Sequence, residues 1–353
     1  MDGTTIGVEE EYQVIDRESG DLVPRARELV PIARERLGER VTAELNRCQI
    51  EVSTPICHDL AEVRSSLTGL RATVDEAAAE IGCGILAAGT HPWSSWQDQE
   101  VADDRPRYRE MADRYQRLAR RQVICGCHVH VGVDDADLVV AAMSRARPWL
   151  PLLLALSANS PFWEGEDTGY DSYRHEVWQS WPTAGLPPDL VDRADYDRVV
   201  QQLCDADAID DATHLYWYLR PSDRYPTLEV RAMDVCLTVD DAVAVAGLSR
   251  ALVRACLREF REGEPQSEAT TELLDAALWR AARYGLSEQL VSPCSLEPVP
   301  AAEAIAELLA KVGPDLDDLG DRDEVTGLVE RILEEGNGAS RQRSGRLADV
   351  TER

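Results

Sequence analysis

Two glutamates near the start of the chain have the type and spacing expected of ligands for a divalent cation. Valine, isoleucine and tyrosine favour a strand over residues 7–16. Successive side chains of a strand point to opposite faces, so Glu9 and Glu11 share one face while Glu10 lies on the other. Neighbouring carboxylates repel each other unless a cation or solvent offsets their charge. The stretch therefore indicates either part of an oxygen-rich cation site or a solvated acidic strand.

Two histidines share one face of another predicted strand, which covers residues 122–133. Its other face is a row of valine and cysteine, and glycines flank His128 and His130. A lone histidine in such a strand favours a hydrogen-bonded core role, but a pair beside glycines leaves room for a ligand or substrate. Cys125 and Cys127 point the other way, so we expect no metal site that joins them to the histidines.

Two further predicted strands repeat this design. Residues 46–54 place Glu51 on the face opposite their apolar side chains, and residues 227–233 do the same with Glu229 and Arg231. If all four strands pair in one sheet, their polar faces meet on one surface and helices cover the apolar side.

Four carboxylates, a histidine and an arginine on one surface indicate a particular chemistry. The carboxylates and the histidine suit two divalent cations, and an arginine two residues from a carboxylate suits a phosphate. Two cations and an arginine are typical of sites that catalyse phosphoryl transfer, in which catalysis is mostly positioning and charge neutralisation. The residues thus predict a metal-dependent enzyme that uses ATP without a Walker loop.

Helices must supply the rest of the fold. Helical spacing of apolar residues predicts helices at residues 25–37, 59–81, 103–121, 135–158, 189–206, 238–261, 268–284, 301–311 and 324–335. Asp59 with Glu62 three residues later is a predicted capping box, and Asp189 is the predicted N-cap of its helix. Pro148 and Pro151 should kink the helix that contains them.

The second half of the chain contains a long loop and a polar end. Loops as long as residues 157–188 are usually functional, and this one holds Arg174 and His175 among aromatic residues. The chain from residue 336 onward is polar. We therefore expect a single catalytic domain over residues 1–336 and a disordered tail over residues 337–353.

The chain is strongly acidic. Its 353 residues carry a net charge of -28, which argues against nucleic acids and anionic membranes as partners. Of its 37 basic residues, Lys311 is the one lysine. An acidic surface with almost no lysine resembles halophilic adaptation, because a Debye length of roughly 3 Å at 1 M salt screens self-repulsion. We expect a high-salt cytoplasm and an origin in a halophilic archaeon.

The cysteines and the apolar runs indicate a cytoplasmic location. Nine cysteines are scattered without the spacing of secreted proteins, and the N-terminus does not resemble a signal peptide. The apolar, uncharged run at residues 148–163 is too short and too rich in proline to span a membrane. The sequence does not specify an oligomeric state.

Short motifs along the chain match, in order, those of a known enzyme family. They are GVEEEY at 7–12, QIE at 49–51, GTHP at 89–92, CGCHVHVG at 125–132, ANSPFW at 158–163, PTAG at 182–185, TLEVR at 227–231 and WRAARYGL at 279–286. Each is a modest signal, but the ordered set is specific. The chain resembles the family-2 glutamate–cysteine ligases, which include broader carboxylate–amine ligases, and more distantly the glutamine synthetase fold.

The resemblance implies an α+β fold with a glutamine synthetase-like catalytic domain. Its curved, mainly antiparallel sheet would bind ATP and cations on the concave face and carry helices on the convex face. The residues implied to bind Mg²⁺, with Mn²⁺ as an alternative, form two groups: Glu11 with Glu51, and Glu9 with His128 and Glu229.

Further residues receive roles through the same motifs. Arg231 is implied to contact the transferred phosphate, and Arg174 to lie near the phosphoryl group or the substrate. His130 and His91 are implied to line the substrate site. Glu10 faces the apolar side, which makes it a structural residue.

The implied reaction has two steps. ATP phosphorylates the γ-carboxylate of L-glutamate to an acyl phosphate, and the amine of L-cysteine then attacks it, forming γ-glutamylcysteine with release of phosphate and ADP. The same motifs serve ligases for other amines, and no residue identifies a cysteine pocket; the high-salt composition favours cysteine only by association. A metal-dependent amide hydrolase is a second reading. A metal- or nucleotide-binding protein without turnover is a third, but such a protein need not retain Arg231.

Overall fold

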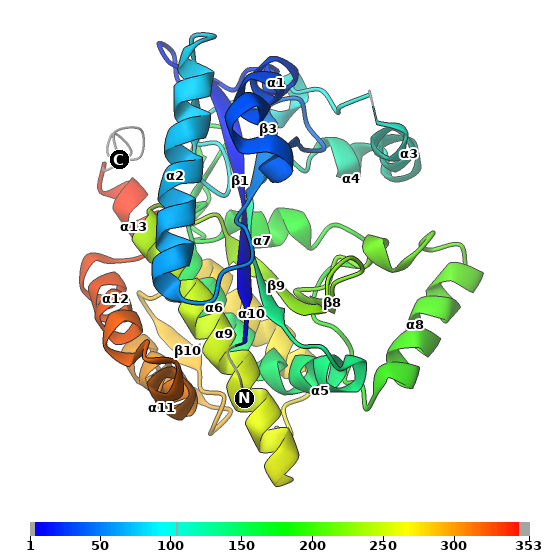
Figure 1. The fold of residues 1–353 in the computed structure, drawn as a ribbon, viewed down its shortest axis with the longest axis vertical. Helices are drawn as coiled ribbons and strands as arrows, with labels where there is room; N and C mark the ends of the chain where they lie inside the picture. Colours follow the sequence, from blue (N-terminus) through cyan, green and yellow to red (C-terminus); the bar gives the residue numbers. More distant parts are fainter. Residues whose placement is uncertain (1–3, 104, 346–353) are drawn as a thin grey trace.

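The predicted polar-faced strands form one sheet through the middle of the molecule (Figure 1). The computed structural model describes residues 4–103 and 105–345. Within them the sheet has seven strands: β1 (Ile6–Asp16), β2 (Val41–Ala43), β3 (Gln49–Ser53), β4 (Cys83–Leu86), β5 (Gly126–Gly132), β8 (Leu219–Pro221) and β9 (Thr227–Asp234). Their order is β2-β3-β1-β5-β9-β8, with β4 also beside β1, and each pairing is antiparallel.

The register of the sheet brings the predicted polar residues side by side. The facing pairs are Glu11 with Glu51, Glu9 with His128, and His130 with Glu229. Residues that face each other across antiparallel strands project from the same side of the sheet. The polar faces therefore converge on one surface, as the alternation of residues predicts.

Helices cover the apolar, convex face of the sheet. α1 (Ala26–Leu37) and α2 (Leu60–Ala79) pack on the upper half of β1 and on β3, around a core that includes Tyr12 and Val14. The half of the sheet that is lower in Figure 1 packs against α5 (Ala136–Ala146), α6 (Leu150–Ser157) and α9 (Val239–Glu262). Because the apolar side chains of the strands are buried here, the polar face is left open on the other side.

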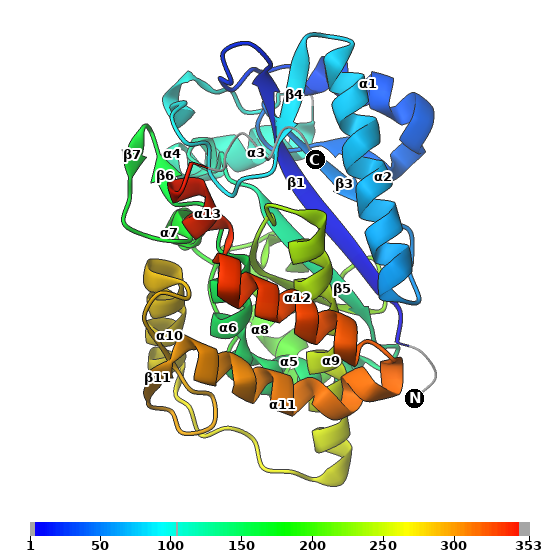
Figure 2. The same ribbon diagram turned by 90° about the vertical axis from the view of Figure 1, so that its left-hand side faces the viewer.

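An outer layer of helices lies over α9 and α6 (Figure 2). Its members are α10 (Thr271–Tyr284), α11 (Ala301–Leu319) and α12 (Arg322–Glu335). Two short antiparallel hairpins lie outside the main sheet. They are β10 (Gln289–Val291) with β11 (Pro298–Pro300), and β6 (Phe162–Trp163) with β7 (Glu166–Asp167). The α+β fold with a mainly antiparallel sheet expected from the sequence is confirmed.

Smaller helices flank the open, concave side of the sheet, to the right in Figure 1. They are α3 (Pro106–Tyr115), α4 (Arg117–Arg120), α7 (Tyr173–Trp178) and α8 (Arg193–Asp205). The single helix predicted over residues 103–121 is wrong, because Gln116 adopts a φ of 51° that ends α3 and separates it from α4. The helix predicted over residues 135–158 is divided into α5 and α6 by a short 3-10 helix that contains Pro148, whereas Pro151 lies in the first turn of α6.

Two predicted helix caps differ in detail from the structure. Asp59 caps α2, but the carboxylate of Glu62 accepts the backbone N–H of His58 instead of that of Asp59, so the reciprocal box is not formed. The prediction of Asp189 as a cap is wrong, because α8 begins later and Asp192 accepts a hydrogen bond from its first turn. Several acidic residues precede this helix, and the sequence alone did not distinguish among them.

The polar end of the chain is folded as far as the structure describes it. The prediction of a disordered tail from residue 337 is wrong for residues 337–345, because α13 (Gly338–Arg343) lies against the body of the protein. Asn337 caps this helix by accepting the backbone N–H of Ser340. Its polar side chains have buried partners, so polarity did not indicate disorder here. Residues 346–353 of the predicted tail lie outside the described residues.

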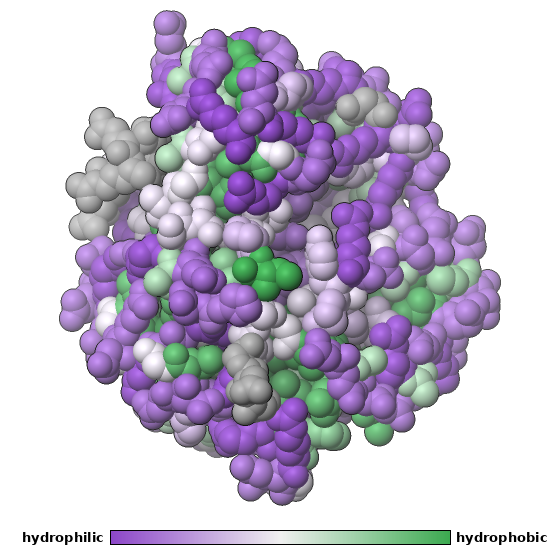
Figure 3. Space-filling model, in the orientation of Figure 1, coloured by the Kyte–Doolittle hydropathy of each residue, from purple (hydrophilic) through white to green (hydrophobic). Residues whose placement is uncertain are grey.

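The surface of the protein is mainly hydrophilic on the face shown in Figure 3. One helical run, Ala136–Ser157, is long and apolar enough to cross a membrane by length and composition. However, 89% of its most apolar 18-residue stretch is buried inside the protein, as in the core helix of a globular fold.

Candidate active site

A cleft of about 430 Å³ opens on the polar face of the sheet. The floor is formed by β1, β3, β5 and β9, and the walls include α3 and the turn between β8 and β9. Seven residues singled out from the sequence line it: Glu9, Glu11, Glu51, His128, His130, Glu229 and Arg231. Strand alternation therefore brings most of the predicted site together.

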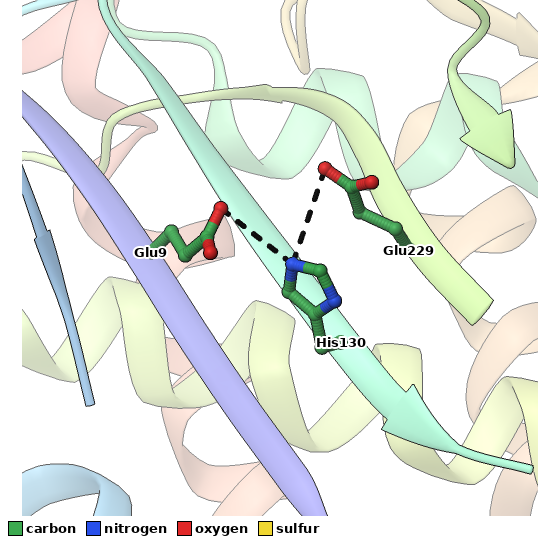
Figure 4. Close-up of side chains that lie close together, drawn as sticks. All are labelled: Glu9, His130 and Glu229. Atoms are coloured by element: carbon green, nitrogen blue, oxygen red, sulfur yellow. Dashed lines mark ion pairs between the residues drawn. The ribbon is translucent and has the colours of Figure 1, made fainter. Parts of the chain in front are cut away.

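His130 lies between two carboxylates from the strands on either side of it (Figure 4). Its Nε2 atom is 3.5 Å from Glu9 Oε2 and 3.9 Å from Glu229 Oε1. Each residue offers one ligand atom, and these three atoms all lie within 4.8 Å of one another. Imidazole nitrogen and carboxylate oxygen atoms at this spacing can bind one divalent cation.

His128 lies near the same two carboxylates, those of Glu9 and Glu229. Its Nδ1 atom is 3.7 Å from Glu9 Oε2 and 4.0 Å from Glu229 Oε1. Both ring nitrogens are buried without a hydrogen-bond partner among the described residues. Burial and the nearby charge of Arg231 lower the pKa of His128, which favours the neutral ring that binds metal ions. With Glu9 and Glu51, His128 forms a second possible cation group.

Glu44 completes a cluster of carboxylates that the sequence did not reveal. It lies with Glu11 and Glu51 at a spacing that can hold a cation. Burial and the charge of Glu11 raise the pKa of Glu44 to about 7. Burial and the charges of Glu9 and Glu44 raise the pKa of Glu51 well above its usual range. Crowded carboxylates of this kind become favourable when a cation binds between them.

Arg220 is a second residue that sequence reasoning missed. It faces Glu229 across β8 and β9, and its Nε atom donates a 2.7 Å hydrogen bond to Glu229 Oε2. Arg231 pairs with the other oxygen of Glu229. Burial alone would raise the pKa of Glu229, but the charges of Arg231 and Arg220 hold it well below its usual range. Glu229 therefore stays ionised inside the cleft, beside two guanidinium groups.

Two predicted site residues do not line the cleft. Arg174 is buried on α7, where its guanidinium carbon is 5.5 Å from the centre of the Trp178 ring, which does line the cleft. His91 lies elsewhere: its Nε2 atom is 2.9 Å from the carbonyl oxygen of Gly20, and its Nδ1 atom accepts the backbone N–H of Ser94. The expectation that His91 lines the substrate site is not met, because both of its ring nitrogens bind backbone outside the cleft.

A cation fits the residues of this cleft. The buried, unpartnered nitrogens of the histidines face carboxylate oxygens at distances too long for a hydrogen bond, and the carboxylates repel one another. Arg231 and Arg220 add positive charge at the same place. Cations and guanidinium groups together suit an anionic substrate that carries phosphate.

The antiparallel sheet with helices packed on one face has the glutamine synthetase-like fold that the sequence predicts. The family model described as glutamate–cysteine ligase family 2 matches residues 5–350. The chain therefore belongs to this family.

Relatives of similar length share about two fifths of their residues with this chain. One from Rhodopirellula baltica, provisionally named glutamate–cysteine ligase 2, is 41% identical over 346 residues that cover 97% of this chain and 93% of the relative. One from Salinispora tropica, with the same provisional name, is 40% identical over 343 residues, or 97% and 90% of the two chains. These relatives do not show an archaeal origin, which stays a prediction.

Solved structures with the same fold are much less similar in sequence. The glutamate–cysteine ligase of Francisella tularensis, in complex with AMP, has a TM-score of 0.76 at 13% identity and covers 100% of this chain and 88% of its own. A bifunctional glutathione synthetase from Pasteurella multocida has a TM-score of 0.71 at 16% identity and covers 100% and 50%. At these identities the likeness shows the fold alone.

Proposed function

We propose that this protein is an ATP-dependent glutamate–cysteine ligase that forms γ-glutamylcysteine and releases ADP and phosphate. The observation that carries the proposal is the meeting of carboxylates, histidines, Arg231 and Arg220 in one cleft. Membership of glutamate–cysteine ligase family 2 supports a ligase over a hydrolase or a binding protein. In this proposal one catalytic domain includes α13 and acts in the cytoplasm.

Two groups of residues would hold Mg²⁺ or Mn²⁺. The first is Glu9 and Glu229 with His128 and His130, and the second is Glu11, Glu44 and Glu51. When bound, the cations supply charge neutralisation for the phosphate oxygens of ATP. The carboxylates then no longer repel one another, which favours the ionised forms of Glu44 and Glu51.

Arg231 has the main catalytic role in this proposal. Its guanidinium group already lies beside Glu229 at the cation cluster, so it is held ready before substrates bind. Arg220 fixes the other oxygen of Glu229 and is itself held by the carbonyl oxygens of Thr213 and Leu215, each at 3.0 Å. Donors that are positioned in advance stabilise charge as it develops on the transferred phosphoryl group.

Apolar and aromatic side chains also form part of the wall of the cleft. Leu45, Met111, Trp178, Trp181 and Tyr216 line it. The rings of Trp181 and Tyr216 lie 4.9 Å apart, and both side chains are largely buried. Acyl phosphates react with water, so a wall of this kind would protect the intermediate until the amine attacks.

The acceptor amine is tested directly. ADP release is measured in molar KCl with Mg²⁺, ATP and glutamate, with cysteine or one of several other amines, and products are identified by mass spectrometry. We expect release that depends on cysteine and yields the dipeptide. Release with another amine alone would replace cysteine in the proposal and keep the mechanism. Amide hydrolysis without ADP formation would instead favour a metal-dependent hydrolase.

We also propose that the protein works in concentrated salt. Its net charge of -28 and single lysine support this. The free energy of unfolding, measured in urea, should rise between dilute buffer and molar KCl because salt screens the repulsion among acidic residues. Full stability in dilute buffer would contradict the salt adaptation without affecting the proposed reaction.

A further inference from the structure

The last described helix, α13, contacts a segment that lies far from it in the sequence. Gln342 Nε2 donates hydrogen bonds to the backbone oxygen of Asn159 at 3.0 Å and to its side-chain Oδ1 at 2.7 Å. The backbone N–H of Ala339 donates to the carbonyl oxygen of Ala158 at 2.9 Å. A Cβ atom at Gly338 would lie 2.3 Å from Asn159 Oδ1, so glycine permits this close approach. The helix therefore holds the beginning of the segment 158–173.

The same helix also holds the end of that segment. Asn337 Nδ2 donates a 3.0 Å hydrogen bond to Asp171 Oδ2. Arg343 pairs with both Asp167 and Asp171. Asp171 directly precedes Ser172, the N-cap of α7. Both ends of the segment are thus fastened to residues 337–343.

A buried carboxylate at the end of β9 holds the segment from the other side. Asp234 Oδ2 accepts hydrogen bonds from the backbone N–H of Asn159 at 2.8 Å and from the hydroxyl of Ser160 at 2.6 Å. Its Oδ1 accepts the hydroxyl of Ser172 at 2.8 Å. The segment is therefore enclosed between the sheet and α13, with its polar groups bound on both sides.

Arg174 is the residue that this enclosed segment positions. Its backbone N–H donates to Ser160 Oγ at 3.0 Å. Its side chain is 1% exposed, and its Nε and Nη1 atoms have no hydrogen-bond partner among the described residues. A Cβ atom at Gly126 would lie 2.3 Å from Arg174 Nη2 and 3.1 Å from His128 Nε2, so the guanidinium group stands directly behind the cation cluster.

We propose that α13 is a positioning element of the active site, and that Gln342 is a positioning residue that acts through Asn159 and Arg174. The Nη2 atom of Arg174 lies beside the cation cluster, where an anionic group of the substrate, a carboxylate or phosphoryl group, would bind, and its Nη1 atom is 3.9 Å from Asp234 Oδ1. Their position is fixed by segment 158–173, and that segment is fixed by α13. The expected effect of Gln342 on turnover rests on the proposed function, whereas its expected effect on segment 158–173 does not.

Hydrogen exchange and kinetics of the full-length protein test the inference together. Gln342→Glu keeps the size of the side chain but places a carboxylate against two oxygens of Asn159, and Gln342→Ala removes the contact. We expect faster hydrogen exchange over residues 158–178 in both variants and unchanged exchange over residues 126–132. Ser344→Ala is the matched control, because Ser344 is the C-cap of α13 and its hydroxyl donates back to the carbonyl oxygen of Arg341 in the same helix.

Turnover should fall while cation binding is retained. A small displacement of Arg174 should lower kcat/KM for glutamate by about 10- to 100-fold, the range expected when a site is misplaced by an ångström or less. Mn²⁺ affinity, measured by electron paramagnetic resonance, should stay within about twofold, since the cation ligands lie on other elements. Unchanged exchange over residues 158–178, or Mn²⁺ affinity that falls in step with turnover, would overturn the inference.

A double variant separates positioning from general stability. If Gln342 acts through Arg174, then Gln342→Ala should cause no further loss of kcat/KM once Arg174→Ala is present. Losses that multiply would overturn the inference. If the wild-type protein releases no ADP with any amine, the proposed function fails, and the exchange experiment alone then decides whether α13 holds the segment.

Discussion

Three consecutive glutamates on β1 lie in two very different environments. Glu10 is fully buried on the apolar face, where Arg71 pairs with both of its oxygens and the hydroxyl of Tyr12 donates to it. Arg71 also donates to the carbonyl oxygens of Cys236 and Leu237, so this charge pair ties β1 to the end of β9. Every partner that Glu10 needs is supplied by the protein.

Glu9 and Glu11 lie on the opposite face of the same strand. Glu9 faces His128 and His130 at distances of 3.5 to 3.7 Å, and Glu11 faces the carboxylates of Glu44 and Glu51. Here the protein gathers like charges and leaves ring nitrogens unpartnered. The comparison shows that burial of a charged side chain does not by itself identify a functional site. A buried charge with complete partners supports the fold, whereas a cluster with incomplete partners is built for a ligand.

The largest effect should come from the structural face. Arg71→Met leaves Glu10 buried without its cationic partner, which should lower the free energy of unfolding by about 3–5 kcal/mol. Urea unfolding measures the loss. Arg36→Met, which breaks exposed ion pairs with Glu76 and Glu80, is the control and should cost less than about 1 kcal/mol. Equal losses in the two variants would remove the distinction between the two faces.

On the functional face, the main effect should be on turnover instead of stability. Arg231→Ala or Glu229→Gln should lower kcat by at least about 100-fold, the scale of losing one contact to charge that develops in the transition state. Steady-state ADP release measures it, and circular dichroism checks that the variants are folded. Near-normal turnover in either folded variant would show that this pair has no catalytic role.

His91 has partners for both of its ring nitrogens, so we expect it to contribute to the stability of the fold in a way that depends on pH. Burial lowers the pKa of His91 to about 4, so the unfolded chain binds a proton below about pH 6.5 that the folded protein binds only near pH 4. This contribution to stability is present above pH 6.5 and is lost as the pH falls through that window, by about 2 kcal/mol at pH 5.

Urea unfolding at pH 7.5 and pH 5 measures this loss of stability. The difference between the two pH values should shrink in His91→Gln by the amount that His91 contributes. Substitution of the exposed His58 by glutamine should leave the difference unchanged. An identical pH dependence in the wild type and in His91→Gln would contradict the burial account.

The smallest effect concerns Glu44. Glu44→Gln should weaken Mn²⁺ binding by at least about 10-fold. Loss of a cation ligand should lower the affinity at least as much as loss of a residue that only orients a ligand. Isothermal titration calorimetry measures the affinity, with Glu80→Gln, at the exposed C-cap of α2, as control. Unchanged affinity would remove Glu44 from the cation cluster and leave Glu11 and Glu51.

The sequence predicted the polar face of the sheet because long strands carry a clear alternation. β1, β5 and β9 are long enough for the pattern to show which side chains share a face, and their pairing follows from it. Arg220 was missed because β8 is three residues long and carries no such pattern, and Glu44 was missed because it follows the equally short β2 instead of lying in a long strand.

Other differences arise where tertiary contacts override local composition. Polar residues 337–343 form a helix because their side chains find buried partners such as Asn159 and Asp241, which are distant in the sequence. Gln116 breaks a charged segment that has no strong helix-ending residue. His91 belongs to a family motif, but after β4 the chain leaves the polar face, so the histidine supports a turn instead of the cleft.

The most direct test of the account is the stoichiometry of the reaction in the presence and absence of the cation. Wild-type protein is incubated with ATP, glutamate and cysteine in molar KCl, with Mg²⁺ or with excess chelator, and ADP and γ-glutamylcysteine are counted. We predict equal amounts of the two products with Mg²⁺ and neither with chelator. A folded protein that leaves ATP intact with every amine tested, or that forms ADP equally well in chelator, would contradict the claim that the incomplete face of the sheet is a cation-dependent ligase site.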